Sequence, residues 1–172
     1  MFTKIDLCSM ALLKLGEKPI QSLGEDSVAA HLAQTLFNPT IETLLAMFPW
    51  RFATQSLVLT KNSDDEFIIP GDVLRVLKWS GKIIGNKIEN NTDTLEITAI
   101  VKTQPECFPG YFATLVATKL AMEFCIPLTG DTNLFRMMTA IYESEYQSAK
   151  FIDSASSNQS SIKDFSLINT RF

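Results

Sequence analysis

Two kinds of hydrophobic periodicity divide this chain. Apolar residues recur at spacings of three and four in four segments, about 3–15, 26–48, 109–126 and 131–152, which predicts four amphipathic helices. Between about 55 and 102 the period changes to two, which predicts a small antiparallel sheet. The expected fold class is therefore mainly α: a four-helix bundle over residues 1–152, with an inserted small antiparallel β-sheet and an extended C-terminal tail.

Local signals define the ends of the first helix. Thr3 and Asp6 have the spacing of a capping box, in which each side chain accepts a hydrogen bond from a backbone N–H of the first turn. Gly16 suits a left-handed C-cap. These signals predict a helix that begins near Thr3 and ends near Leu15.

The later helices contain two prolines with different expected effects. Asp26 is the expected N-cap of the second helix, and Pro39 lies inside it. The hydrophobic period continues on both sides of Pro39, which favours one kinked helix over two abutting ones. Pro127 is expected to end the third helix.

The buried face of the last helix is expected to consist of Leu134, Phe135, Met138, Ile141, Tyr142, Tyr146 and Ala149.

The segment 153–172 differs from the rest in composition. Five of the nine residues from 153 to 161 are serine, and such a sequence buries too little apolar area to order itself. Apolar residues follow directly: Ile162, Phe165, Leu167, Ile168 and Phe172. A flexible spacer with apolar anchors predicts a docking tail for a partner, and the alternative is a tail that folds back onto the chain's own sheet.

Composition and charge exclude some classes of protein. The 172 residues include 15 Lys or Arg and 19 Asp or Glu, which gives a net charge of −4. A broad basic face for gripping nucleic acid is therefore not expected, although DNA could still pass through an assembly of such chains. Charged residues and prolines interrupt the apolar runs, and the N-terminus lacks signal-sequence features, so we expect a soluble, unexported protein without a membrane span.

The sequence contains few candidates for catalytic or metal-binding residues. The only histidine, His31, has neither a nucleophile elbow nor a glycine-rich loop beside it, so a surface or partly buried helix position is expected. Cys8, Cys107 and Cys125 lack the paired spacing of zinc ligands, although with His31 they could formally make a Cys₃His set. The acidic run 64–66 is expected to be a solvated loop rather than a cation site. No catalytic, cofactor or metal site is predicted.

The motif Pro49-Trp50-Arg51-Phe52 marks the change from helix to sheet. Its bulky rings predict that Trp50 and Arg51 stabilise this junction as part of the core. The alternative is that they are anchors of an interface, because Trp, Phe and Arg are enriched at binding hot spots. Trp79, at the end of a predicted strand, leaves the same two interpretations open.

Three features, taken in order, resemble the head-to-tail adaptors of tailed phages, described as tail tubular protein A or head completion proteins. They are the first helix with its Leu-Gly ending, the segment 48–54 (FPWRFAT) and the segment 67–77 (FIIPGDVLRVL). The family pattern is a helix, then hPWxFA, then h-x-h-P-x-D-x-hRVL, where h is apolar, followed by a sheet and two helices. The likeness covers about residues 5 to 150.

The resemblance implies a non-enzymatic structural connector at the head-tail junction of a virion, made in the bacterial host cytoplasm. Such adaptors form a homo-oligomeric ring, commonly of twelve subunits, that binds the portal protein and offers a platform to a tail nozzle or tail tube protein. DNA passes through the channel without sequence-specific binding, and the excess acid is expected to line it. A C-terminal extension that enters the portal would make Phe165, Leu167, Ile168 and Phe172 the portal-docking residues.

Two other functions remain open from the sequence. The first is a cytosolic α+β protein-binding module that uses the same tail and sheet without forming a ring. The second is a hydrolase, which would have to use His31 or carboxylates alone.

Overall fold

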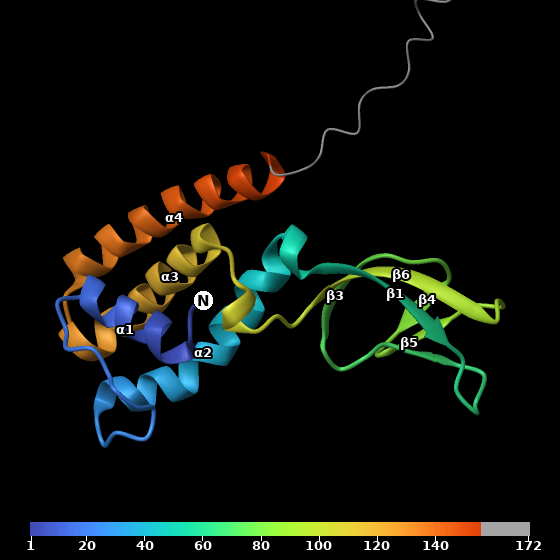
Figure 1. The fold of residues 1–172 in the computed structure, drawn as a ribbon, viewed down its shortest axis with the longest axis horizontal. Coiled ribbons are helices and arrows are strands. Elements are labelled where there is room, and N and C mark those ends of the chain that lie inside the picture. The colour runs from blue at the N-terminus through green and yellow to red at the C-terminus, as the bar shows by residue number, and fades with distance from the viewer. Residues whose placement is uncertain (156–172) are drawn as a thin grey trace, which may run out of the picture.

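The computed structural model describes residues 1–155 and shows two parts joined end to end (Figure 1). The first part, the helical body, contains four helices: α1 (Lys4–Lys14), α2 (Val28–Met47), α3 (Gly110–Thr129) and α4 (Thr132–Ala155). The second part, the β arm, extends from one end of the body and contains six strands: β1 (Thr54–Thr60), β2 (Phe67–Ile68), β3 (Val73–Lys78), β4 (Lys82–Ile84), β5 (Lys87–Glu89) and β6 (Thr94–Val101). Short 3₁₀ helices, η1 (Arg51–Ala53) and η2 (Pro105–Cys107), lie at the two crossings between the parts.

Helix α3 is the centre of the helical body, because each of the other three helices packs against it. It is buried over most of its circumference, including Phe112, Leu115, Leu120 and Phe124. By length and composition alone α3 is apolar enough to cross a membrane, but 56% of that window is buried inside the protein. This burial is what the central helix of a core requires.

The β arm consists of two antiparallel three-stranded sheets with strand orders β1-β6-β3 and β2-β5-β4. Their inner faces share a hydrophobic cluster that is separate from the helical core: Leu59, Phe67, Ile88, Leu95, Ile97 and Ala99. A bridge between Lys61 and Phe67 joins the two sheets at the distal end. The arm therefore has a core of its own.

The prediction of a mainly α four-helix bundle with one small inserted sheet is wrong. Residues 1–155 form a mixed α+β fold with 52% helix, the short 3₁₀ helices included, and 19% strand in two sheets. The sequence pattern identified β1, β3 and β6, but β2, β4 and β5 contain only two or three residues each. Strands this short cannot show a period of two, so the second sheet has no clear signature in the sequence.

Several predicted helix ends can be compared with the structure. The capping box is confirmed, since Thr3 N–H donates to Asp6 Oδ2 (2.8 Å) and Asp6 N–H donates to Thr3 Oγ1 (3.1 Å). Gly16 has the expected positive φ of +77°. The N-cap of α2 is Ser27 rather than Asp26, and α2 is a single helix through Pro39.

Two helices extend beyond their predicted ends. Helix α3 passes Pro127 and ends at Thr129, because a proline in the last turn removes only one hydrogen bond. Gly130, with φ +65°, then provides the left-handed C-cap. Helix α4 continues to Ala155, three residues into the segment expected to be tail.

Candidate interaction surfaces

The junction between body and arm is built around Trp50. Its side chain is fully buried, and its Nε1–H donates to the carbonyl oxygen of Leu44 (2.8 Å). Phe48 and Phe112 pack edge-on against the indole, with ring centroids 4.9 and 5.0 Å away. Trp50 is thus a core residue of the junction rather than an anchor on an exposed interface.

A buried carboxylate, Asp153, ties the end of α4 to this junction. Asp153 is 2% exposed, and its oxygens accept hydrogen bonds from the backbone N–H of Arg51 (3.1 Å) and from the Tyr111 hydroxyl (2.6 Å). The side chain of Arg51 is exposed, so the hydrogen bond that Arg51 contributes here comes from its backbone. This contact is not predicted by the sequence, in which Asp153 is expected to belong to the tail.

Two further contacts hold the arm at its base. The Arg75 guanidinium in β3 donates from Nη1 to the carbonyl oxygen of Ala46 at the end of α2 (2.9 Å). Lys102, directly after β6, forms an ion pair with Glu42 of α2 (2.9 Å). The two family-like segments, 48–54 and 67–77, thus both contribute to the contacts that join the arm to the body.

The pH dependence of the free energy of unfolding should reveal the hydrogen bond between the Tyr111 hydroxyl and Asp153. Burial, together with the hydrogen bond to Asp153 and its charge, raises the pKa of the Tyr111 hydroxyl above its ordinary value. Above about pH 10 the unfolded chain loses this proton while the folded chain keeps it, so stability falls as the pH rises. Tyr111→Phe should lower the urea midpoint at neutral pH but make its further decline between about pH 9 and about pH 11 shallower. An unchanged alkaline slope would contradict this role.

The β arm exposes large apolar side chains. Val58 is 68% exposed and Trp79, just after β3, is 45% exposed; Ile68 and Ile84 are also exposed. A largely apolar groove of about 610 Å³ lies beside β3 and is lined among others by Ile69, Pro70, Val73, Val76 and Ile83. The arm therefore offers a surface for a protein partner.

One side of α4 exposes a second, partly apolar surface. A line of exposed residues runs along this side and is called the α4 seam below: Met137, Ile141, Ser144, Ser148, Phe151 and Ala155. Phe151 is 74% exposed and Met137 is 53% exposed. Ile141 was expected in the buried face, but it is 36% exposed and lies on the seam.

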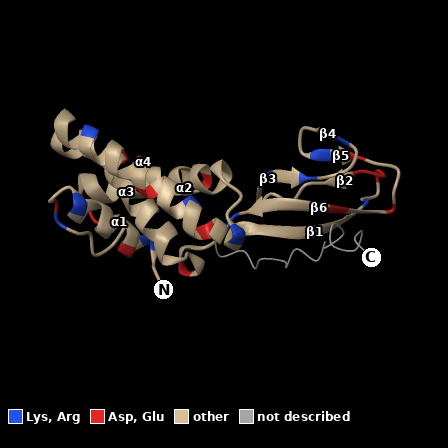
Figure 2. Cartoon of the chain, turned by 90° about the horizontal axis from the view of Figure 1, so that it is seen from above, with Lys and Arg blue, Asp and Glu red and all other residues tan. Residues whose placement is uncertain are grey.

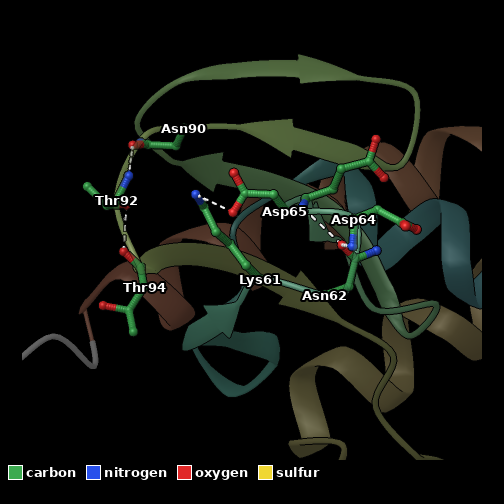
Figure 3. Close-up of polar contacts among 8 residues, drawn as sticks. Lys61, Asn62, Asp64, Asp65, Asn90, Thr92 and Thr94 are labelled. Atoms are coloured by element: carbon green, nitrogen blue, oxygen red, sulfur yellow. Dashed lines mark hydrogen bonds and ion pairs between the residues drawn. The ribbon is translucent and has the colours of Figure 1, made fainter.

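The distal tip of the arm is ordered by its own polar contacts (Figure 3). The Asn62 side chain accepts hydrogen bonds from the backbone N–H groups of Asp64 and Glu66 (both 2.9 Å). Lys61 pairs with Asp65 (2.8 Å), and Lys87 pairs with Glu66 (2.6 Å). In the neighbouring loop, Asn90 accepts from Thr92 N–H (3.1 Å), and the Thr92 hydroxyl donates to the Thr94 carbonyl (2.8 Å). The acidic run 64–66 is a loop whose carboxylates at 65 and 66 are neutralised by lysines.

The residues considered for chemistry lie apart. His31 is largely exposed on α2, and its Nε2 lies 3.7 Å from Asp26. Burial raises the pKa of the Cys8 thiol to about 12, which keeps it protonated and unreactive at neutral pH. Cys125 is buried and Cys107 is exposed. Within residues 1–155, no three His, Cys, Asp or Glu side chains come together as metal ligands.

The four predicted portal-docking residues, Phe165, Leu167, Ile168 and Phe172, lie outside the described residues. Comparison of the chain with protein-family models and with curated proteins finds no significant match. Support for a function therefore comes from the surfaces described above and from the sequence motifs.

Proposed function

We propose that this protein is a structural connector of a tailed phage or prophage, assembling as a ring that joins the portal to the tail. The observation that carries the proposal is the attachment of a β arm with its own core to a helical body, through the two segments that resemble the adaptor motifs. A connector needs this geometry, because each subunit has to hold one protein at its body and another at its arm.

The distribution of exposed apolar residues supports ring assembly. A subunit in a closed ring needs two different contact faces, because head-to-tail contacts close a cycle whereas one self-complementary patch gives a dimer. The chain has apolar surface on the β arm, around Val58 and Trp79, and separately on the α4 seam of the body. These surfaces lie on different parts of an elongated molecule (Figure 1).

The charge distribution supports a channel through which DNA passes unbound. Lysines and arginines are interspersed with acidic residues along both body and arm in the described part (Figure 2). The net charge of each subunit is −4. Affinity for DNA phosphates requires clustered cations that release counterions, so such a ring would let DNA pass.

The portal-docking prediction can be tested in the full chain. Changing Phe165, Leu167, Ile168 and Phe172 together to Ser should weaken binding to the cognate portal by on the order of a hundredfold or more, because buried apolar anchors dominate interface energies. The matched control changes Ser156, Ser157, Ser160 and Ser161 to Gly and should bind like the original chain. Equal portal affinity of the two variants, measured by surface plasmon resonance, would refute the docking role of these residues.

A further inference from the structure

The β arm has an opening between β3 and β4. Within residues 1–155, β3 pairs only with β6, and β4 pairs only with β5. Only the three residues 79–81 link β3 to β4, yet the two strands are not paired with each other. The groove of about 610 Å³ lies here, since Val73 and Val76 of β3 and Ile83 of β4 line it. It is therefore bordered by the edge strands of both sheets, and an edge strand has a row of unpaired backbone N–H and C=O groups.

The floor of the groove belongs to the hydrophobic core of the arm. Ile69, Val73, Val76 and Ile83 pack against the buried cluster that contains Phe67, but each of the four remains only partly buried. The core of the arm is thus incomplete on this side. Apolar side chains from another molecule would complete it and would remove these four residues from water.

The shape of β3 limits how long a partner strand can be. The register of β3 with β6 shifts at Leu74 and again at Leu77. These two leucines pack against the helical core, whereas Val73 and Val76 pack against the core of the arm. Because such bulges interrupt regular pairing along an edge, a partner can pair with only a few residues of β3. Its apolar side chains must then supply much of the affinity.

The charges around the groove favour an acidic partner. Residues 67–88 contain four Lys or Arg and one acidic residue, Asp72. Arg75, Lys78 and Lys82 are exposed, and within the described part of the chain none of them forms an ion pair. Glu89 is the cross-strand neighbour of Lys82 but forms no ion pair with it. An acidic segment is therefore attracted to this region, and a basic segment is repelled.

We propose that the groove between β3 and β4 binds a short extended segment of another protein, in which apolar and acidic side chains alternate. Successive side chains of an extended chain point to opposite sides, so the apolar set fills the groove over Val76 and Ile83. The acidic set stays at the surface, where Lys78 and Lys82 are exposed. The backbone of the segment pairs with an edge strand, which a helix cannot do because its backbone hydrogen bonds are internal.

This inference concerns the arm alone. It does not depend on ring assembly or on the portal, so either proposal can fail while the other holds.

Fluorescence anisotropy of a labelled peptide with the full chain tests the binding. The probe is Glu-Val-Glu-Val-Glu-Val-Glu, which spans about 23 Å when extended and so matches the six residues of β3. It should bind saturably and at least about tenfold more tightly than the same peptide with Lys in place of Glu. Proline in place of the central Val should weaken binding on the order of tenfold, because proline has no N–H to pair.

Charge reversal in the protein locates the site. Lys78→Glu combined with Lys82→Glu should weaken binding of the acidic peptide on the order of tenfold and strengthen binding of the lysine peptide. This gain also shows that the variant is folded. The matched control, Lys18→Glu combined with Arg136→Glu, changes the net charge equally at exposed positions of the helical body and should bind like the original chain.

Four results would overturn the proposal. The first is an acidic peptide that binds no more tightly than the lysine peptide. The second is equal affinity for the proline peptide, and the third is an equal loss in the two double variants. The fourth is hydrogen–deuterium exchange of 73–84 that slows as the concentration of the peptide-free chain rises, which would assign the groove to a second copy.

Discussion

Replacing Trp50 with Ala should lower the free energy of unfolding by about 3–5 kcal/mol, because it leaves a large cavity in a rigid cluster of rings. The indole is fully buried, and the substitution also leaves the Leu44 carbonyl oxygen without its donor. Typical domains are stable by only about 5–15 kcal/mol, so the variant should be close to unfolding. The melting temperature, followed by circular dichroism at 222 nm, should fall by on the order of 10 °C.

The other tryptophan provides the matched control. Trp79 is 45% exposed at the end of β3, so Trp79→Ala should change the free energy of unfolding by less than about 1 kcal/mol. Similar losses for the two substitutions would show that Trp50 is not the centre of the junction.

Replacing Asp153 with Ala should lower the free energy of unfolding by about 3 kcal/mol. The substitution removes the acceptor of two hydrogen bonds. It leaves the Arg51 N–H and the Tyr111 hydroxyl without a partner at a junction that is partly shielded from water. Asp153→Asn keeps one acceptor oxygen and should have a smaller effect. Urea denaturation curves measure both losses.

Two control substitutions locate the effect. Asp64→Ala changes an exposed carboxylate at the tip of the arm and should be nearly neutral. Arg51→Ala should also cost little, since Arg51 contributes its backbone N–H, which alanine retains. An Arg51→Ala loss as large as that of Asp153→Ala would mean that the guanidinium, not the backbone, supports the junction.

The parts of the fold with long periodic patterns could be predicted from the sequence. The four helices occur within three residues of their expected ends, because each repeats its apolar spacing over several turns. The second sheet could not be predicted, since β2, β4 and β5 depend on contacts with each other and with β1. The α+β fold is thus set by non-local pairing that no single segment shows.

The junction was predictable in place but not in detail. The aromatic residues around position 50 indicated a core junction, and Trp50 is buried there. The Asp153 contact joins residues 102 positions apart, and a polar residue before a serine-rich stretch resembles the start of a tail. The α4 seam could not be predicted for another reason. Ile141 lies three residues after Met138, so the spacing alone places both residues on one face.

The measurement that most directly tests the connector function is native mass spectrometry of the full chain mixed with the cognate portal protein, with negative-stain microscopy of the same sample. The account predicts a closed ring of this protein, of about twelve copies, stacked on the portal ring. The absence of a complex, or binding as scattered single subunits without a ring, would contradict the account and favour a simple protein-binding module.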